Sequence, residues 1–270
     1  MSKFGNFSQY PQRSLLSAEA ALLTAWRSLD RYWDELVLVG GLAVHYLTKQ
    51  EIPGLPGAVT MDVDFGISLG TEAGGQYGNI QTHLSGLGFI QEGSRWSQNH
   101  GKIKLYIDFL TEDPPHISGV REVDGAQANL IPGINRALIK SRDVKIKGND
   151  LYGVAHECKV RVADIGPLLA LKLNAFGGPT GRRHPKDAYD VLLAVTGFVD
   201  GPEAAISGFR SEAAADNSAY GSAVECLKKD FCEPNRDGPA RGASFHPGDT
   251  AEQERIKQDI VTVGRALLGI

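Results

Sequence analysis

Hydrophobic and polar residues follow different periods along the chain, and the changes of period predict its helices and strands. Between Ser14 and Leu36 apolar residues recur at helical spacing, which predicts an amphipathic helix. Leu36 to Val39 is a short apolar run that stops at two glycines, as a buried strand would, and helical spacing resumes from Leu42 to Lys49. From Lys102 to Leu110 apolar and polar residues alternate, which predicts a strand with one buried face.

The rest of the pattern predicts a sheet region that gives way to a mostly helical one. Further strands are expected at Val59–Ile67, Phe89–Trp96 and Lys140–Val162, and helices at Glu72–Leu87, Ile165–Phe176 and Lys186–Phe198. Beyond Gly201 both ends look helical, with a Pro/Gly-rich loop from Glu233 to Gly248 between them. This order predicts an α/β or α+β protein rather than an all-α one, with the main domain boundary near residue 115.

Composition and charge narrow the class of protein. With 270 residues, 42% hydrophobic and 22% charged, the chain reads as a folded globular protein and not as a disordered or fibrous one. Its net charge of -4 argues against a chain that binds polyanions over its whole surface. The N-terminus has no apolar signal region and no apolar run is long enough to cross a bilayer, so a soluble, cytoplasmic protein without membrane association is expected. The three cysteines lack CxxC spacing and are expected to be plain thiols.

Two glycines, Gly40 and Gly41, stand where the predicted strand passes into a helix. Such a turn lets the backbone approach a ligand closely, and the helix start offers unpaired N–H groups to an anion. A tight turn that binds nothing fits the same residues.

Three aspartates are the main candidates for chemistry. Asp62 and Asp64 are two residues apart on a predicted strand, so both carboxylates project from one face. Ionising both needs a compensating cation, and oxygen ligands of this kind suit Mg²⁺ or Mn²⁺. Asp108 falls on the polar side of a later strand and is expected to face the same cleft. A solvated strand face is the plain alternative for each of them.

The order of these pieces resembles the polymerase-β-type nucleotidyltransferase superfamily, and most closely the AbiEii/MenT-like toxin nucleotidyltransferases. The glycine pair precedes Thr60-Met61-Asp62-Val63-Asp64, the strand with Asp108 follows, and later come a lysine helix and a basic-acidic helix. The lysine helix is LALKLNA at residues 169–175, and the basic-acidic segment is RRHPKDAYD at residues 182–190. The superfamily's usual Gly-Ser is Gly-Gly here, as it often is in the toxin branch.

The resemblance implies an α+β nucleotidyltransferase-like fold, a mixed sheet flanked by helices and followed by a mostly helical C-terminal region. It implies a core at residues 1–115 with the glycine turn and the three-aspartate site, and a region at 116–270 that completes the nucleotide and acceptor cleft. Asp62, Asp64 and Asp108 would hold two Mg²⁺ or Mn²⁺ ions, and an NTP would be the substrate. Nucleotide-binding roles would fall to Gly40, Gly41, Lys172, Arg183, Asp187 and Asp190, with Lys172 also counted as catalytic.

Ordinary structural roles fit several of these residues as well. Lys172 fits a helix-surface lysine, and Asp187 and Asp190, at i and i+3, fit the acidic first turn of a helix. The acceptor is open: tRNA or another RNA, a protein, or a small molecule such as an antibiotic. A toxin-type enzyme would have an antitoxin as partner. A non-catalytic nucleotide-binding protein of the same fold is the alternative to an enzyme. The basic stretch from Arg136 to Lys147 would carry RNA phosphates if RNA were the acceptor, and otherwise is a solvated strand face.

Overall fold

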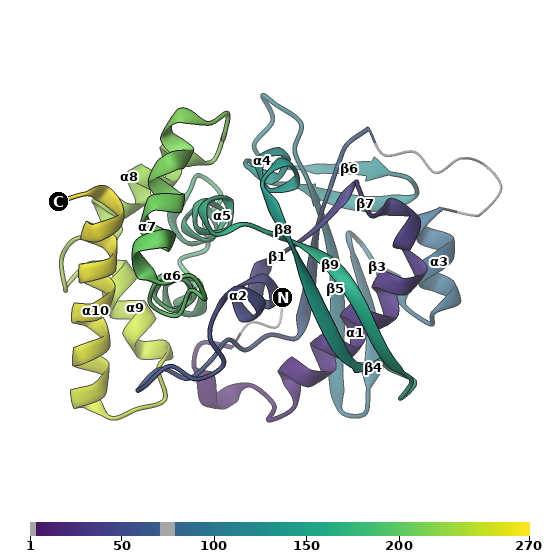
Figure 1. Ribbon diagram of the computed structural model, residues 1–270, viewed down its shortest axis with the longest axis horizontal. Coiled ribbons are helices and arrows are strands. Elements are labelled where there is room, and N and C mark those ends of the chain that lie inside the picture. The colour runs from purple at the N-terminus through teal and green to yellow at the C-terminus, as the bar shows by residue number, and fades with distance from the viewer. Residues whose placement is uncertain (1–3, 71–78) are drawn as a thin grey trace. The chain divides into compact units, whose positions relative to one another are not determined.

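A computed structural model of the protein describes residues 4–70 and 79–270 (Figure 1). These residues group into two compact units, each built from segments that are distant in the sequence. Unit 1 consists of the described residues of Met1–Pro11 together with Val44–Val59 and Ile165–Ile270, and unit 2 consists of Gln12–Ala43 and Thr60–Asp164. The mixed α+β class is confirmed, since unit 2 contains a mixed sheet flanked by helices and the C-terminal part of unit 1 is helical.

Unit 2 is built on a sheet that has nine strands within the described residues, joined in the order β3-β4-β5-β2-β1-β9-β8 with β7 and β6 continuing from β5. The sheet is mixed, because β1 is antiparallel to β2 but parallel to β9, and β2 is parallel to β5. The strands are β1 (Leu36–Val39), β2 (Asp62–Ile67), β3 (Ile90–Glu92), β4 (Arg95–His100), β5 (Ile103–Thr111), β6 (Val120–Val123), β7 (Ala126–Leu130), β8 (Ser141–Asn149) and β9 (Ala155–Ala163).

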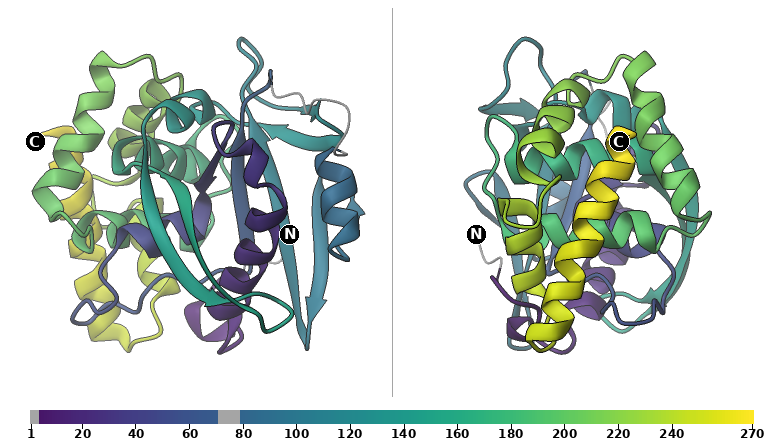
Figure 2. Two further views of the ribbon diagram at one scale, coloured as in Figure 1. Left: turned by 45° about the vertical axis from the view of Figure 1, so that its right-hand side comes forward. Right: turned by 90° about the vertical axis from the view of Figure 1, so that its left-hand side faces the viewer.

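Helices pack on both faces of this sheet. On one face α1 (Ser14–Ser28) lies along the strands, and its Trp26 ring is 5.9 Å from that of Phe65 in β2 (Figure 2, left). The other face carries α4 (Ile134–Ile139), because a Cβ atom on Gly66 would lie only 3.2 Å from Ile134. A short helix, α3 (Ile80–Gly86), packs beside β3.

Unit 1 is an assembly of helices around α5 (Ile165–Gly177). Almost every residue of α5 is buried, which is expected of a helix that is apolar on all sides. The helices that pack against α5 are α6 (Pro185–Thr196), α7 (Pro202–Ser211) and α8 (Tyr220–Asp230), and α9 (Asp237–Phe245) and α10 (Thr250–Leu268) pack on these in turn. The long helix α10 packs against α6, α7, α8 and α9; it begins with a capping box between Asp249 and Glu252 and ends at Gly269 in the left-handed conformation (Figure 2, right).

The compact units do not divide the chain at residue 115. The strands that follow this point complete the sheet of unit 2, since β7 pairs with β5 and β9 pairs with β1. Sequence pattern identified the strand character of β8 and β9 but could not show which earlier strand each would join.

Three predicted elements differ in the structure. The strand expected at 89–96 is a hairpin, β3 and β4, that turns at Gly93-Ser94, and the helix expected from Ser14 to Leu36 ends at Ser28. The loop expected at 233–248 contains α9. The helix tolerates Pro239, because this proline lies in the first turn, where its missing N–H costs nothing. Of the helix expected at 72–87, α3 accounts for the C-terminal part, and residues 72–78 lie outside the described residues.

Candidate active site

The strand β2 carries Asp62 and Asp64 on one face, as the alternation predicts. Val63 and Phe65 point to the other side, where both are fully buried, while the two aspartates are partly exposed. The carboxylates are therefore held by a strand whose position is fixed by its apolar side.

Asp108 lies on the neighbouring strand directly beside this pair. In the parallel register of β2 and β5, Asp64 is opposite Asp108 and Asp62 is opposite Tyr106. Residues opposite each other in a ladder project from the same face, so the three carboxylates share one side of the sheet. The expectation that Asp108 faces the same region as Asp62 and Asp64 agrees with this register.

Gly40 packs directly against Asp64. The antiparallel pairing of β1 and β2 places Val39 opposite Asp64, and Gly40 begins α2 (Gly40–Leu47) with φ of +71°. A Cβ atom on Gly40 would lie 1.9 Å from Oδ2 of Asp64, so any side chain here would require the carboxylate to move. Gly41, in the first turn of α2, is buried. Glycine at position 40 is thus required both by the backbone conformation and by the closeness of the carboxylate.

Arg95 joins the three-aspartate face, and sequence reasoning missed it. In the antiparallel pairing of β4 and β5 it is opposite Asp108, and its Nε and one Nη donate to the two carboxylate oxygens of Asp108 at 2.7 and 2.8 Å. The same Nη donates to Oδ1 of Asp62 at 3.0 Å. The guanidinium also stacks over the ring of Tyr106, 4.1 Å from its centroid. The signal was the Gly101-Lys102 pair, a two-residue turn between His100 and Ile103 that sets the register of β4 against β5 and so aligns Arg95 with Asp108.

The electrostatics of this face are dominated by burial and mutual repulsion. Burial raises the pKa of Asp108 to about 7, and the negative charge of Asp64 acts in the same direction, while the hydrogen bonds from Arg95 oppose the rise. For Arg95, burial acts to lower the pKa of the guanidinium, but hydrogen bonding to Asp108 and the charges of the three aspartates raise it overall. Arg95 is therefore a permanent cation among three carboxylates.

The other predicted site residues belong to unit 1, where they form a buried ionic cluster. Lys172 of α5 and Lys186 of α6 both donate to Oδ2 of Asp190 at 2.6 Å, and Nζ of Lys172 is 3.9 Å from Asp187. Lys172 is 5% exposed and Asp190 only 1%. Burial acts to raise the pKa of Asp190, but the two lysines outweigh it and hold this pKa below its ordinary value. Asp187 and Asp190 thus lie on one helical face, and Lys172 contacts both.

Arg183 is engaged apart from this cluster. Its φ is +51°, and its guanidinium donates to Asp230 at 2.9 Å and also pairs with Asp237. These contacts tie the segment before α6 to α8 and α9. Arg183 therefore pairs with Asp230 and Asp237, whereas Asp187 and Asp190 pair with Lys172.

The basic stretch around β8 is a ladder of charges of both signs. Lys147 pairs with Glu157 across β8 and β9 at 2.9 Å, and Lys159 pairs with Asp143. Since β8 is an end strand of the sheet order, charged side chains of this kind suit a solvated edge. The structure supports the solvated strand face for this segment.

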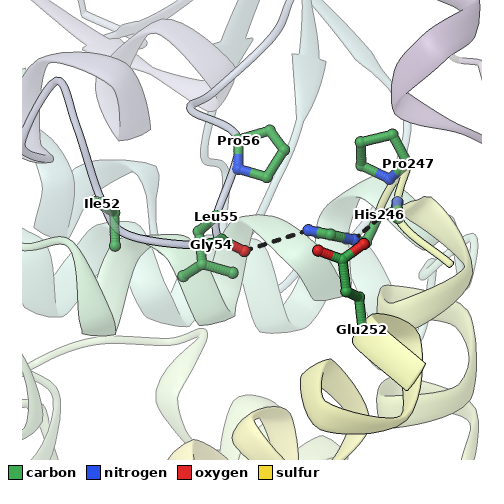
Figure 3. Close-up of a pocket in the computed structure, with 8 residues that line it drawn as sticks. Ile52, Gly54, Leu55, Pro56, His246, Pro247 and Glu252 are labelled. Carbon is green, nitrogen blue, oxygen red and sulfur yellow. Dashed lines mark hydrogen bonds between the residues drawn. The ribbon is translucent and has the colours of Figure 1, made fainter. Parts of the chain in front are cut away.

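A shallow pocket in unit 1, with a volume of about 420 Å³, lies between the 52–56 loop and the residues that precede α10 (Figure 3). Its two titratable side chains are committed to local structure. Nδ1 of His246 accepts from the Gly248 N–H and Nε2 lies 3.3 Å from the Gly54 carbonyl, while Glu252 forms the capping box. We assign no chemistry to this pocket.

Two features are absent from the residues that the structure describes. Within residues 4–70 and 79–270, no group of three or more His, Cys, Asp or Glu side chains is arranged around a metal position. In the same ranges no helix has the length and apolar character to span a bilayer.

No protein-family model matches the sequence, and no curated protein matches it either. Among solved structures, the chain is similar to the CD-NTase CdnG of Bradyrhizobium diazoefficiens, solved in complex with GTP. The two share 10% identity over 93% of this chain and 84% of that one, with a TM-score of 0.27. A TM-score this low does not establish a shared fold, and what the protein does must be argued from its own residues.

Proposed function

We propose that the protein is a metal-dependent nucleotidyltransferase that moves NMP from an NTP to a hydroxyl group of an acceptor. One observation carries this proposal: Asp62, Asp64 and Asp108 lie side by side on one face of two parallel strands, with Gly40 packed against Asp64. Three carboxylates beside a glycine turn at a helix start are ligands of the kind that a hard cation takes, and the turn offers a place for phosphate oxygens. With Arg95 bonded to Asp62 and Asp108 they are not arranged around a metal position, so a cation would require these side chains to move.

The types of donor fit a hard divalent cation. The three carboxylates outnumber the single guanidinium among them, so the face keeps an excess of negative charge that a cation would neutralise. Asp62, Asp64 and Asp108 would hold Mg²⁺ or Mn²⁺, in the two-ion arrangement that the family resemblance implies. When bound, the ions supply neutralisation of the triphosphate charge.

The chain's own groups account for binding of the NTP phosphates and for removal of the proton from the acceptor hydroxyl. The N–H groups at the start of α2 bind phosphate oxygens, since they have no partner within their own helix and Gly40 leaves room for close approach. Burial raises the pKa of Asp108 to about 7 in the metal-free protein, and the charge of bound cations would lower it, so that Asp108 would be a carboxylate able to accept the proton of the acceptor hydroxyl at neutral pH. The hydroxyl oxygen forms its bond to the α-phosphorus of the NTP, and pyrophosphate leaves with the electrons of the broken bond.

The roles expected for the residues of unit 1 stay predictions. Lys172, Asp187 and Asp190 form an internally neutralised cluster, in which the ammonium of Lys172 is held by Asp190. Arg183 is paired with Asp230 and Asp237. Replacing Lys172 by Met, and measuring the Km for NTP against kcat, tests whether this lysine contributes to nucleotide binding.

The test of the proposed function is label transfer. Purified protein is incubated with each α-³²P-labelled NTP and Mg²⁺, alone, with total tRNA, or with cell extract, and Asp64→Asn serves as the matched control. We expect label on an acceptor and release of pyrophosphate with the wild type and neither with the variant. Absence of transfer with all four NTPs and every acceptor mixture would contradict the proposal.

The same assay identifies the acceptor. Label on RNA places the protein with RNA-modifying transferases, and label on a polypeptide with protein-modifying ones. Transfer that appears only with dialysable extract identifies a small-molecule acceptor. The toxin role and an antitoxin partner remain predictions from the family resemblance, and growth arrest on induction of the wild type but not of Asp64→Asn would support them.

A further inference from the structure

Arg95 lies among the aspartates and supplies a positive charge that offsets part of their negative charge. Its fork holds both oxygens of Asp108, and the same Nη that bonds to Asp108 also reaches Asp62. The guanidinium also stacks on the ring of Tyr106. One arginine therefore fixes the rotamers of two carboxylates that stand on different strands.

We propose that Arg95 is an internal counterion that holds the aspartates in a metal-free arrangement, and that divalent cations bind only by displacing it. This inference rests on the proposed function, because it assigns the same carboxylates to the metal. It makes Arg95 a positioning residue that sets how much divalent metal the site requires.

The competition follows from the atoms involved. Both oxygens of Asp108 and Oδ1 of Asp62 are engaged by guanidinium N–H groups at 2.7 to 3.0 Å. A Mg²⁺ ion would have to approach the same oxygens to about 2.1 Å and would then lie against a cation. Because like charges at such a distance repel strongly in a partly buried site, the two occupants exclude each other.

The guanidinium is partly open to solvent. The side chain of Arg95 is 19% exposed, and Arg95 is the first residue of β4, directly after the Gly93-Ser94 turn. Its departure would remove hydrogen bonds to charged groups, each worth about tenfold in an equilibrium constant, and the metal must compensate for that loss.

The test measures Mn²⁺ binding to the full chain without nucleotide, from the loss of the free-ion electron paramagnetic resonance signal. We expect Arg95→Gln to bind Mn²⁺ at least about tenfold more tightly than the wild type. The matched control is Arg121→Gln, since Arg121 of unit 2 also pairs with one aspartate, Asp113 at 2.8 Å, outside the three-aspartate face. That variant should leave the Kd for Mn²⁺ unchanged.

Equal or weaker binding of Mn²⁺ by Arg95→Gln overturns the inference, since a merely structural arginine would not lower metal affinity by its presence. If the wild type nevertheless transfers NMP, only the role of Arg95 fails. If the wild type fails to transfer NMP in the labelling assay, the proposed function fails as well, whatever the Mn²⁺ affinities are.

A second measurement uses the wild-type protein alone and so does not depend on whether a variant folds. The ¹⁵N–¹H signal of the Arg95 Nε group in the wild type reports its hydrogen bond to Asp108. We expect this signal to shift as Mg²⁺ is added, with the same midpoint as the Mg²⁺-dependent rise in Tm. A signal that stays in place while Tm rises to its plateau would show that Arg95 and the metal coexist, and would overturn the inference.

Discussion

Replacing Gly40 by Ala tests the close approach of the glycine turn to Asp64. The new Cβ would lie 1.9 Å from Oδ2, 2.6 Å from Cγ and 2.9 Å from Cβ of Asp64, so the carboxylate has to move. Alanine at φ of +71° also costs about 1–2 kcal/mol in backbone strain. Because a shift of about 1 Å in a reacting group can lower a rate about 100-fold, we expect Gly40→Ala to lose at least that factor in kcat/KM.

The matched control is Gly101→Ala, in the turn between β4 and β5. Gly101 has φ of +62°, but a Cβ there would meet nothing within 4 Å, so this variant carries the backbone cost without the collision. Both variants should lose about 1–2 kcal/mol of unfolding free energy from the backbone, and only Gly40→Ala should lose transfer activity. Equal activity in the two variants, measured by NMP transfer at saturating Mg²⁺, would refute the argument from close approach.

The remaining predictions concern charge. Asp64→Asn should abolish NMP transfer while leaving Tm unchanged or higher, because it relieves repulsion among the carboxylates; measurable transfer would contradict the proposed site. Arg95→Gln should raise the pKa of Asp108 above about 7, since the hydrogen bonds that oppose the rise are gone, and a ¹³C carboxyl titration would show an unchanged or lower value if this reasoning is wrong. Asp190→Asn should cost about 3–5 kcal/mol by removing the carboxylate charge to which both buried lysines donate, against under about 1 kcal/mol for Asp143→Asn on an exposed pair. Since the pKa of Asp190 is lowered on folding, its contribution to stability is present above the unfolded value of about 3.9 and is lost as pH falls through the folded one; acid unfolding curves of wild type and Asp190→Asn should therefore converge at low pH.

The paired aspartates could be predicted because a strand imposes a period of two. Asp62 and Asp64 had to share a face once β2 was recognised, and the apolar residues between them show which face is buried. The partnership of Asp64 with Asp108 was expected only from the order of motifs. Asp64 and Asp108 are opposite each other only because of the register in which β2 pairs with β5, and the local pattern of hydrophobic and polar residues contains no information on that pairing.

The loop predicted at 233–248 was wrong over α9, because glycines there allow close helix packing rather than turns. In α9, a Cβ at Gly238 would lie 2.9 Å from the Phe231 ring, and a Cβ at Gly242 would lie 2.5 Å from Ile260. These glycines let α9 approach its neighbours closely, although their local propensity favours a loop. The stability of such a helix comes from tertiary contacts, which the sequence does not display.

The parallel pairing of β1 with β9 has a consequence for synthesis of the chain. β1 consists of four buried apolar residues, and its partner on one side, β9, ends at Ala163, more than a hundred residues later. Until that segment has left the ribosome, one edge of β1 is an unpaired apolar strand, which is prone to pair with other chains. A fragment that stops at residue 115 would contain all three aspartates and would keep that edge open permanently. We therefore expect such a fragment to aggregate, whereas one extended through Ala163 closes the edge beside the strand that leads into Gly40.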